Sequence, residues 1–236
     1  MRIEIWTDVI CPWCGIGEHR LTEALHRFGH GADVEVVHRS FQLDPRAPLG
    51  TTETVRQMLK TRKRLSDAQV DGLVKNVERV AAADGLAPYV VGDNHTGNTS
   101  LAHELAAWAT EQGRGAEIWA RLYTAYFGEA RSIFDVDSLV ELARELGLDT
   151  DTAREVLTSR RYEQQVLADG REAQELGASG VPFIVIDRRY AIAGAQPVAT
   201  MLGALEKAWT EQRPTPAAVN VGDDALCGPD GCALPQ

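Results

Sequence analysis

The chain has 236 residues, of which 44% are hydrophobic and 25% charged, a balance typical of a globular protein of one or two domains. With 24 basic and 34 acidic residues its formal net charge is −10, which argues against a general nucleic-acid-binding protein. No run of about 18 apolar residues is present, so we expect no membrane-spanning helix and no membrane partner. The N-terminus alternates apolar and charged side chains and lacks the continuous apolar stretch of a signal peptide, which predicts a cytoplasmic protein.

The first forty residues predict a strand, a helix and a second strand. The opening segment alternates, with Ile3 and Ile5 on one face and Trp6 half covered on the other. Apolar side chains then recur at helical spacing, and Pro12 suits the first turn of that helix, where a missing N–H costs nothing. The valine-rich segment 34–37 predicts the second strand.

A helical block is predicted to follow, because apolar side chains recur at helical spacing throughout residues 51–160. Residues 88–91 are the one short strand candidate within it. Three patterns typical of helix N-termini occur in the block: Ser66 with Gln69, Asn98 or Thr99, and Asp135. We expect its aromatic side chains to fill a core: Trp108, Trp119, Tyr123, Tyr126 and Phe127.

The last part of the chain returns to mixed structure. A helix is predicted over residues 161–176, then a buried strand over 180–187 and a helix over 196–212. Residues 190–193 are its hairpin partner, although the turn between the two strands lacks the usual Gly or Asn.

Removing the helical block leaves the element order β–α–β followed by α–β–β–α, which is that of a thioredoxin fold. We therefore predict an α/β protein with a thioredoxin-like fold and a large inserted α-helical domain. The expected division is a discontinuous thioredoxin-like domain, 1–50 and 161–212, a helical insertion domain, 51–160, and a C-terminal tail, 213–236.

Two of the four cysteines, Cys11 and Cys14, enclose Pro12 and Trp13 at the predicted start of the first helix. A thiolate attacks disulfides far better than a thiol does, and the positive end of a helix dipole favours the thiolate. Cys11 is placed to receive that field, and Cys14, one turn further in, is placed to resolve a mixed disulfide. Half of a zinc site has the same spacing, but the flanking strand and helix favour redox chemistry.

A proline near the other end of the chain supports this interpretation. Pro182 lies at the start of an apolar strand, where a missing ladder donor is tolerated. The sequence leaves open whether its peptide bond is cis or trans, and only about 5–6% of X–Pro bonds are cis.

These residues resemble the DsbA family of thiol–disulfide oxidoreductases, most closely its FrnE-like branch. The resemblance covers about residues 1–211 and rests on the motifs Cys11-Pro12-Trp13-Cys14, Trp6-Thr7-Asp8, Gly180-Val181-Pro182-Phe183 and Gly194-Ala195-Gln196-Pro197. It implies that Cys11 is the nucleophile, that Cys14 is the resolving thiol, and that a cis Pro182 packs beside them. It also implies that Val181 offers its backbone to a bound peptide, with Trp13 beside the same substrate.

One departure from the family pattern limits what can be carried over. Better-known periplasmic members have a histidine where this chain has Trp13, and an indole supplies no positive charge to a thiolate. The strong oxidising power of those members is therefore not expected here.

The second pair of cysteines lies in the tail. Gly228-Pro229-Asp230-Gly231 between Cys227 and Cys232 is a turn sequence, so a disulfide between the two is feasible. Similarity to FrnE-like proteins implies an auxiliary redox pair that exchanges with Cys11 and Cys14. A structural staple, or a zinc site formed by all four cysteines, are the alternatives.

The sequence therefore predicts an enzyme, a protein disulfide oxidoreductase or isomerase that needs no cofactor. Its expected partners are protein or peptide thiols and disulfides, with glutathione or another thiol as reductant. One alternative is a glutathione-dependent small-molecule isomerase or transferase related to the kappa class, which typically has Ser where this chain has Cys11. The other is a zinc-binding non-enzymatic module.

A few polar residues have no assigned role at this stage. His38 ends the second predicted strand, and His103 lies on a helix of the block. The basic run Lys60, Arg62, Lys63 and Arg64 predicts a solvated helix face that is able to meet acidic substrates.

Overall fold

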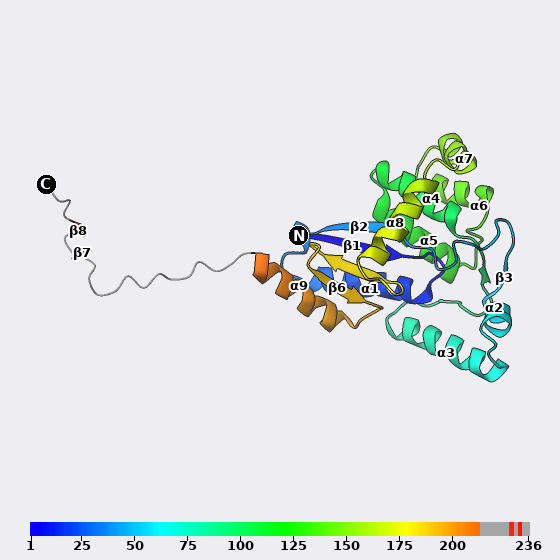
Figure 1. Ribbon diagram of the computed structural model, residues 1–236, viewed down its shortest axis with the longest axis horizontal. Helices are drawn as coiled ribbons and strands as arrows, with labels where there is room; N and C mark the ends of the chain where they lie inside the picture. The colour runs from blue at the N-terminus through cyan, green and yellow to red at the C-terminus, as the bar shows by residue number, and fades with distance from the viewer. Residues whose placement is uncertain (213–226, 229–230, 233–236) are drawn as a thin grey trace.

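The computed structural model describes residues 1–212, 227–228 and 231–232. A four-stranded sheet in the order β2-β1-β5-β6 is built from both ends of the chain (Figure 1). Its strands are β1 (Arg2–Thr7), β2 (Glu35–Ser40), β5 (Phe183–Ile186) and β6 (Tyr190–Ala193). β2 runs parallel to β1, whereas β5 is antiparallel to β1 and β6 to β5. Because β1 is paired on both sides, the residues that follow it are held inside the molecule.

Helices cover both faces of this sheet. The alternating sequence of β1 places its side chains on the two faces in turn. Ile3 and Ile5 face α1 and α9 in one apolar cluster, while Trp6 faces the other side. The expectation that Trp6 is half covered is wrong, since Ala173 and Phe183 pack on it and it is fully buried. The helices that cover the two faces of the sheet are α1 (Pro12–Arg27), α8 (Glu163–Glu175) and α9 (Val198–Gln212).

The helical block lies beyond one end of the sheet (Figure 1). It contains α2 (Val55–Arg62), α3 (Asp67–Ala83), α4 (Ser100–Glu111), α5 (Gly115–Tyr123), the π-helical turn η2 (Thr124–Gly128), α6 (Val136–Glu145) and α7 (Thr150–Thr158). The sequence pattern gave no separate bounds for α7, and for α2 it gave only the helix face expected at the basic run. A short 3₁₀ turn, η1 (Gly31–Asp33), precedes β2.

The short strand candidate at residues 88–91 has no regular structure. The strands in the block are β3 (Glu53–Thr54) and β4 (His95–Thr96), which pair antiparallel. The expectation that the block is helical throughout is therefore wrong at this one place. The pairing fixes the start of α2, because β3 leads directly into that helix.

The predicted helix caps and core are largely confirmed. Ser66 and Gln69 form a complete capping box, and the Asp135 side chain accepts a hydrogen bond from the Ser138 N–H. At α4, Thr99 is the residue before the helix and Asn98 accepts from the Ser100 N–H. The five aromatic side chains assigned to the core are all buried: Trp108, Trp119, Tyr123, Tyr126 and Phe127.

The hairpin between β5 and β6 turns without Gly or Asn because two residues adopt left-handed backbone angles. Asp187 has φ 48° and Arg188 has φ 57°. Long-range contacts hold both in place: the Asp187 carboxylate accepts a hydrogen bond of 2.8 Å from the Arg2 N–H, and the Arg188 guanidinium binds Glu4. Within the residues described, no helix is long and apolar enough to cross a bilayer.

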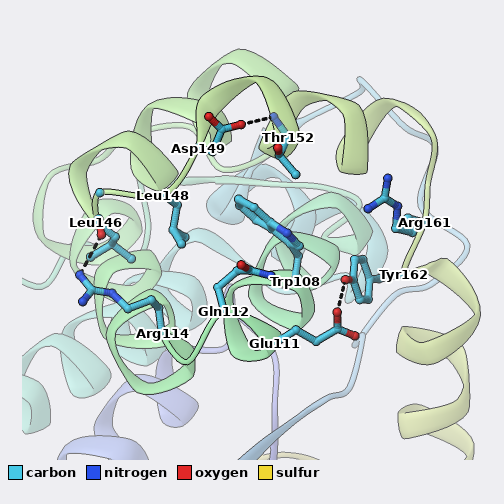
Figure 2. Close-up of a pocket in the computed structure, with 11 residues that line it drawn as sticks. Trp108, Glu111, Gln112, Arg114, Leu146, Leu148, Asp149, Thr152, Arg161 and Tyr162 are labelled. Atoms are coloured by element: carbon cyan, nitrogen blue, oxygen red, sulfur yellow. Dashed lines mark hydrogen bonds between the residues drawn. The ribbon is translucent and has the colours of Figure 1, made fainter.

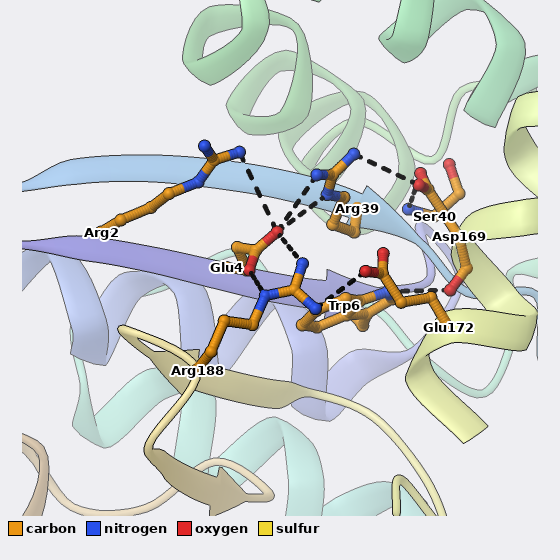
Figure 3. Close-up of polar contacts among 8 residues, drawn as sticks. All are labelled: Arg2, Glu4, Trp6, Arg39, Ser40, Asp169, Glu172 and Arg188. Atoms are coloured by element: carbon orange, nitrogen blue, oxygen red, sulfur yellow. Dashed lines mark hydrogen bonds and ion pairs between the residues drawn. The ribbon is translucent and has the colours of Figure 1, made fainter. Parts of the chain in front are cut away.

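A buried carboxylate organises the face of the sheet under α8 (Figure 3). Glu4, whose side chain is 4% exposed, accepts hydrogen bonds from Arg39 at 3.1 Å and from Arg188 at 2.7 Å. Arg39 also reaches Asp169 of α8, and Asp169 accepts a hydrogen bond from the Ser40 N–H at 3.0 Å. Burial alone raises the pKa of Glu4, but the hydrogen bonds and charges of Arg188 and Arg39 outweigh it and hold that pKa below its usual range.

This network predicts a pH-dependent contribution to stability. Because the pKa of Glu4 is lowered in the folded state, its stabilisation is present above the unfolded pKa and is lost as the pH falls through the folded one. We expect Glu4→Gln to lower the free energy of unfolding by about 1–3 kcal/mol at pH 7, since the arginines lose a charged acceptor. Urea unfolding should show the difference between the two proteins narrowing as the pH falls below the ordinary glutamate pKa of about 4.3.

Glu141→Gln is the matched control, because Glu141 pairs with Arg144 on the exposed surface of α6. It should have no measurable effect on stability. A Glu4→Gln variant as stable as the parent at pH 7 would contradict the prediction.

Candidate active site

Cys11 and Cys14 lie where β1 passes into α1. Cys11 is the residue before the helix, with extended backbone angles, and Pro12 occupies the first helical turn. The Cys11 N–H donates to the Asp8 carbonyl at 3.1 Å, which fixes the turn between strand and helix. Both cysteines are free and buried, Cys11 with 5% of its surface exposed and Cys14 with none.

The structure brings the segment around Pro182 against this pair. The Cys11 thiol donates to the Val181 carbonyl, with 3.6 Å between sulfur and oxygen. The Val181–Pro182 peptide bond is cis, which is the isomer that the resemblance implied. Four residues singled out from the sequence, Cys11, Cys14, Val181 and Pro182, therefore meet at one place.

Two glycines of α1 make this approach possible. A Cβ atom on Gly17 would lie 2.8 Å from the Pro182 ring, and one on Gly15 would lie 2.5 Å from the Tyr89 hydroxyl. That hydroxyl donates a hydrogen bond of 2.6 Å to the Pro12 carbonyl. The helix is thus fitted closely between the Pro182 segment on one side and Tyr89 on the other.

The surroundings of Cys14 keep its thiol protonated. Burial is the largest cause that raises the pKa of Cys14, and the neighbouring Cys11 raises it further. A hydrogen bond from the Thr7 side chain and one from the Asp8 backbone favour the thiolate, but they do not compensate for burial. Thr7 is in turn hydrogen-bonded to the Tyr123 hydroxyl.

Asp8 and His103 form a buried pair that sequence reasoning missed. The His103 Nε2 lies 3.2 Å from one Asp8 carboxylate oxygen, and the other oxygen accepts a hydrogen bond of 2.7 Å from the Leu43 N–H. Neither side chain of the pair is exposed. Asp8 thus joins the turn before Cys11 to the segment around Leu43. The motif Trp6-Thr7-Asp8 was the available signal, but nothing in the sequence pointed from it to a residue of α4.

His38 is the other histidine without an assigned role, and its contacts are with residues other than the two cysteines. Its Nε2 is 2.9 Å from a Glu18 carboxylate oxygen, and its ring stacks on Trp119. His103 contacts the edge of the same Trp119. Among the described residues no group of three or more His, Cys, Asp or Glu side chains is arranged to hold a metal ion.

A pocket opens beside Trp13. It has a volume of about 640 Å³, and Ile10, Pro12 and Trp13 contribute to its wall next to the cysteines. Most of the remaining wall comes from the segment after β2 and from α2 and α3 of the helical block, and residues near 91, 96–97 and 126–127 complete it. We call it the α2–α3 pocket. It places Trp13, which is half buried, between the cysteine pair and an open apolar space.

A second pocket, of about 710 Å³, lies within the helical block (Figure 2). The ends of α4 and α6 and the starts of α5 and α7 surround it, and Tyr162 donates to Glu111 across one side. None of its lining residues belongs to α1 or to the Pro182 segment. It therefore has no part in the candidate site.

The tail pair lies largely outside what the structure describes. β7 (Cys227–Gly228) and β8 (Gly231–Cys232) pair antiparallel, with Cys227 opposite Cys232, as the turn sequence predicts. The side chains of both cysteines, and residues 213–226, 229–230 and 233–236, lie outside the described part. The suggested disulfide and the four-cysteine zinc site therefore stay untested.

The fold and the cysteine pair define a protein of the thioredoxin class with a helical insertion. Residues 2–206 match the family model of the DSBA-like thioredoxin domain. The chain belongs to this family, and so to the DsbA-like thiol–disulfide oxidoreductases.

Solved structures agree with this assignment. A probable DsbA oxidoreductase from Streptomyces coelicolor is 43% identical, with a TM-score of 0.87 over 100% of both chains. A 2-hydroxychromene-2-carboxylate isomerase is 16% identical, with a TM-score of 0.69 over 90% of this chain and 98% of that one. The cytosolic disulfide reductase DsbM from Pseudomonas aeruginosa, solved with glutathione, is 20% identical, with a TM-score of 0.60 over 89% and 99%. The last two share the fold.

The close packing of α1 leads to a prediction about Gly17. We expect Gly17→Ala to lower the free energy of unfolding by about 1–3 kcal/mol, because the new methyl group meets the Pro182 ring. Gly203→Ala in α9 is the matched control, since a Cβ there meets nothing within 4 Å. It should raise stability by up to about 1 kcal/mol through helix propensity. Chemical denaturation of the two variants checks both signs, and a stabilised Gly17→Ala protein would refute the argument.

A second prediction concerns the Cys14 thiol in the reduced protein. Its pKa should lie above the ordinary thiol value of about 8.5, because burial disfavours the thiolate. The Cβ chemical shift of Cys14 in protein labelled with ¹³C-cysteine should therefore change only above that pH, with Cys14→Ser identifying the signal. The same shift makes the reduced protein lose stability as pH rises beyond the ordinary value, since the unfolded chain releases the proton first. A midpoint at or below the ordinary value would count against this assignment.

Proposed function

We propose that this chain exchanges disulfides with protein substrates through Cys11 and Cys14, as an oxidoreductase or isomerase. The observation that carries the proposal is the position of Cys11. It is the residue before α1, its sulfur lies 3.6 Å from the Val181 carbonyl, and Cys14 follows one helical turn later. The positive end of the helix dipole favours negative charge at this point.

Cys11 acts as the nucleophile and Cys14 as the resolving thiol. In the reducing direction the Cys11 thiolate attacks a substrate disulfide, forming a mixed disulfide and releasing one substrate thiolate. Cys14 then gives up its proton and attacks the Cys11 sulfur, so that the second substrate thiolate leaves and the Cys11–Cys14 disulfide forms. Two electrons pass to the substrate. In the oxidising direction the same steps run in reverse.

Isomerisation results when Cys11 attacks a substrate disulfide and another thiol of the same substrate then displaces Cys11, before the Cys11–Cys14 disulfide forms. The direction depends on the potential of the pair against that of the compartment, where about 30 mV corresponds to 1.4 kcal/mol.

Substrate binding is assigned to Val181 and Trp13, with Pro182 packed beside the reacting sulfurs. Val181 lies just before β5, and its N–H has no acceptor among the residues that the structure describes. An extended peptide can pair with such a backbone group strand to strand. This supports a protein or peptide substrate.

Several finer assignments belong to the same proposal. We place the chain in the FrnE-like branch, in the cytoplasm, with glutathione or another thiol as reductant. The tail pair, Cys227 and Cys232, serves as the auxiliary redox pair, and the domain division is the one expected from the sequence. The likeness to a disulfide reductase solved with glutathione supports the choice of reductant.

The glutathione-dependent isomerase alternative receives less support. The isomerase that this chain resembles is 16% identical, a level at which the likeness concerns the fold. A free thiol at position 11 beside a second one at position 14 favours disulfide exchange over that chemistry.

Single cysteine variants test the proposal. With glutathione as reductant, Cys11→Ser should reduce insulin no faster than the buffer thiol alone, because no nucleophile remains. Cys14→Ser should instead accumulate a mixed disulfide with the substrate on Cys11, visible by mass spectrometry, because nothing resolves it. Insulin reduction or refolding of scrambled ribonuclease that persists in Cys11→Ser would refute the mechanism. The redox state of both pairs in glutathione buffers, read in the same spectra, reports the direction.

A further inference from the structure

The α2–α3 pocket has an apolar interior that reaches the surface next to the cysteine pair. Leu43 and Leu73 both line it, and they are 50% and 49% exposed, among the most exposed large apolar side chains of the described residues. Behind them lie the buried Val74 and Val77 of α3. Exposed apolar side chains grouped at the mouth of a pocket mark a binding surface, whereas single ones do not.

The same mouth carries positive charge that the protein does not neutralise. Of the three basic residues lining the pocket, Arg62 is paired, with Asp44 at 2.9 Å and Glu53 at 2.7 Å. The side chains of Arg46 and Lys63 have no ion pair or hydrogen bond with any described residue. Lys63 belongs to the basic run noted in the sequence. Two uncompensated cations thus stand at an apolar pocket in a chain whose net charge is −10.

We propose that the α2–α3 pocket binds an acidic, apolar segment of the protein substrate, next to the cysteine that exchanges with Cys11. The proposal rests on the disulfide exchange proposed above and names the substrate class. Apolar side chains of the segment cover Leu43 and Leu73, and its carboxylates lie near Arg46 and Lys63. Trp13 forms the wall shared by the pocket and the cysteine pair, so the bound segment adjoins the reacting bond.

The size and chemistry of the pocket favour a peptide segment over a small polar disulfide. A volume of about 640 Å³ lies within the range of roughly 300–1,000 Å³ found for pockets that enclose a whole drug-sized molecule, so more than one side chain fits. Oxidised glutathione carries carboxylates but no large apolar group that would cover the two leucines. A peptide supplies both.

The test measures binding to the full chain by fluorescence anisotropy. Two labelled peptides share an apolar core and a serine in place of cysteine, and differ in having glutamates or lysines beside the core. We expect the acidic peptide to bind about fivefold more tightly at low salt, since exposed charge pairs are individually weak. The preference should shrink in 0.5 M NaCl because such pairs are screened.

Charge-reversal variants locate the effect. Arg46→Glu/Lys63→Glu should reverse the preference. Arg171→Glu/Lys75→Glu, which makes the same change in net charge at two exposed residues outside the pocket, should leave it intact. Leu73→Ser should weaken both peptides equally, because it removes apolar contact and not charge.

Three results would overturn the proposal: equal binding of the two peptides, an unchanged preference in Arg46→Glu/Lys63→Glu, or its loss in the control variant as well. Displacement of the acidic peptide by oxidised glutathione, with the same dependence on Arg46 and Lys63, would identify a small disulfide as the occupant instead. Because the peptides contain no cysteine, their binding does not depend on Cys11. Failure of disulfide exchange in the insulin assay is therefore a separate outcome.

Discussion

The start of α1 is held by three segments that are far apart in the sequence, and the candidate site depends on their agreement. Asp8 accepts the Cys11 N–H, Tyr89 donates to the Pro12 carbonyl, and Pro182 lies against Gly17. Each contact comes from a different part of the fold: the end of β1, the helical block and the start of β5. The position of the Cys11 sulfur is therefore a property of the whole fold, and the helical block is part of what sets it.

The close packing that fixes the helix also affects the chemistry of the second thiol. Cys14 is fully buried, so its charged form is disfavoured, and burial is the largest cause of its raised pKa. Cys11 is the residue before the first turn of the helix, and its thiol donates to the Val181 carbonyl. An attacking thiol and a resolving thiol have different requirements, because the second must stay protonated until the mixed disulfide has formed. The burial of Cys14 is a physical means of delaying the second step.

How much of this arrangement the sequence predicts depends on how far apart along the chain the contacting residues lie. Local patterns identified the central strands, the capping box of Ser66 and Gln69, and the cysteine pair at a helix start, since each depends on neighbours within a few residues. The short strands β3 and β4 were missed because two residues carry no periodic signal. Trp6 was predicted to be half covered because its burial depends on α8, which lies far away in the sequence. Its indole N–H donates a hydrogen bond to the Asp169 carbonyl, more than 160 positions further along the chain.

The same reasoning explains the missed site residues. Tyr89 and Pro12 are 77 positions apart, and His103 and Asp8 are 95 apart, so no spacing rule connects them. The hairpin turn was uncertain because Asp187 and Arg188 are unusual at positive φ, and what holds them there is Arg2 and Glu4 on another strand. Tertiary contacts override turn propensity at this point.

The overall charge and the local charge of the molecule act over different distances. A net charge of −10 repels acidic partners at long range and disfavours nucleic acid. Within the Debye length, about 8 Å at physiological ionic strength, a bound segment experiences its immediate neighbours far more than the distant surface. Arg46 and Lys63 at the mouth of the α2–α3 pocket therefore set the sign of the charge next to a docked segment, although the chain as a whole is acidic. An acidic protein can in this way select an acidic substrate, with slow encounter and favourable contact once the apolar side chains are in place.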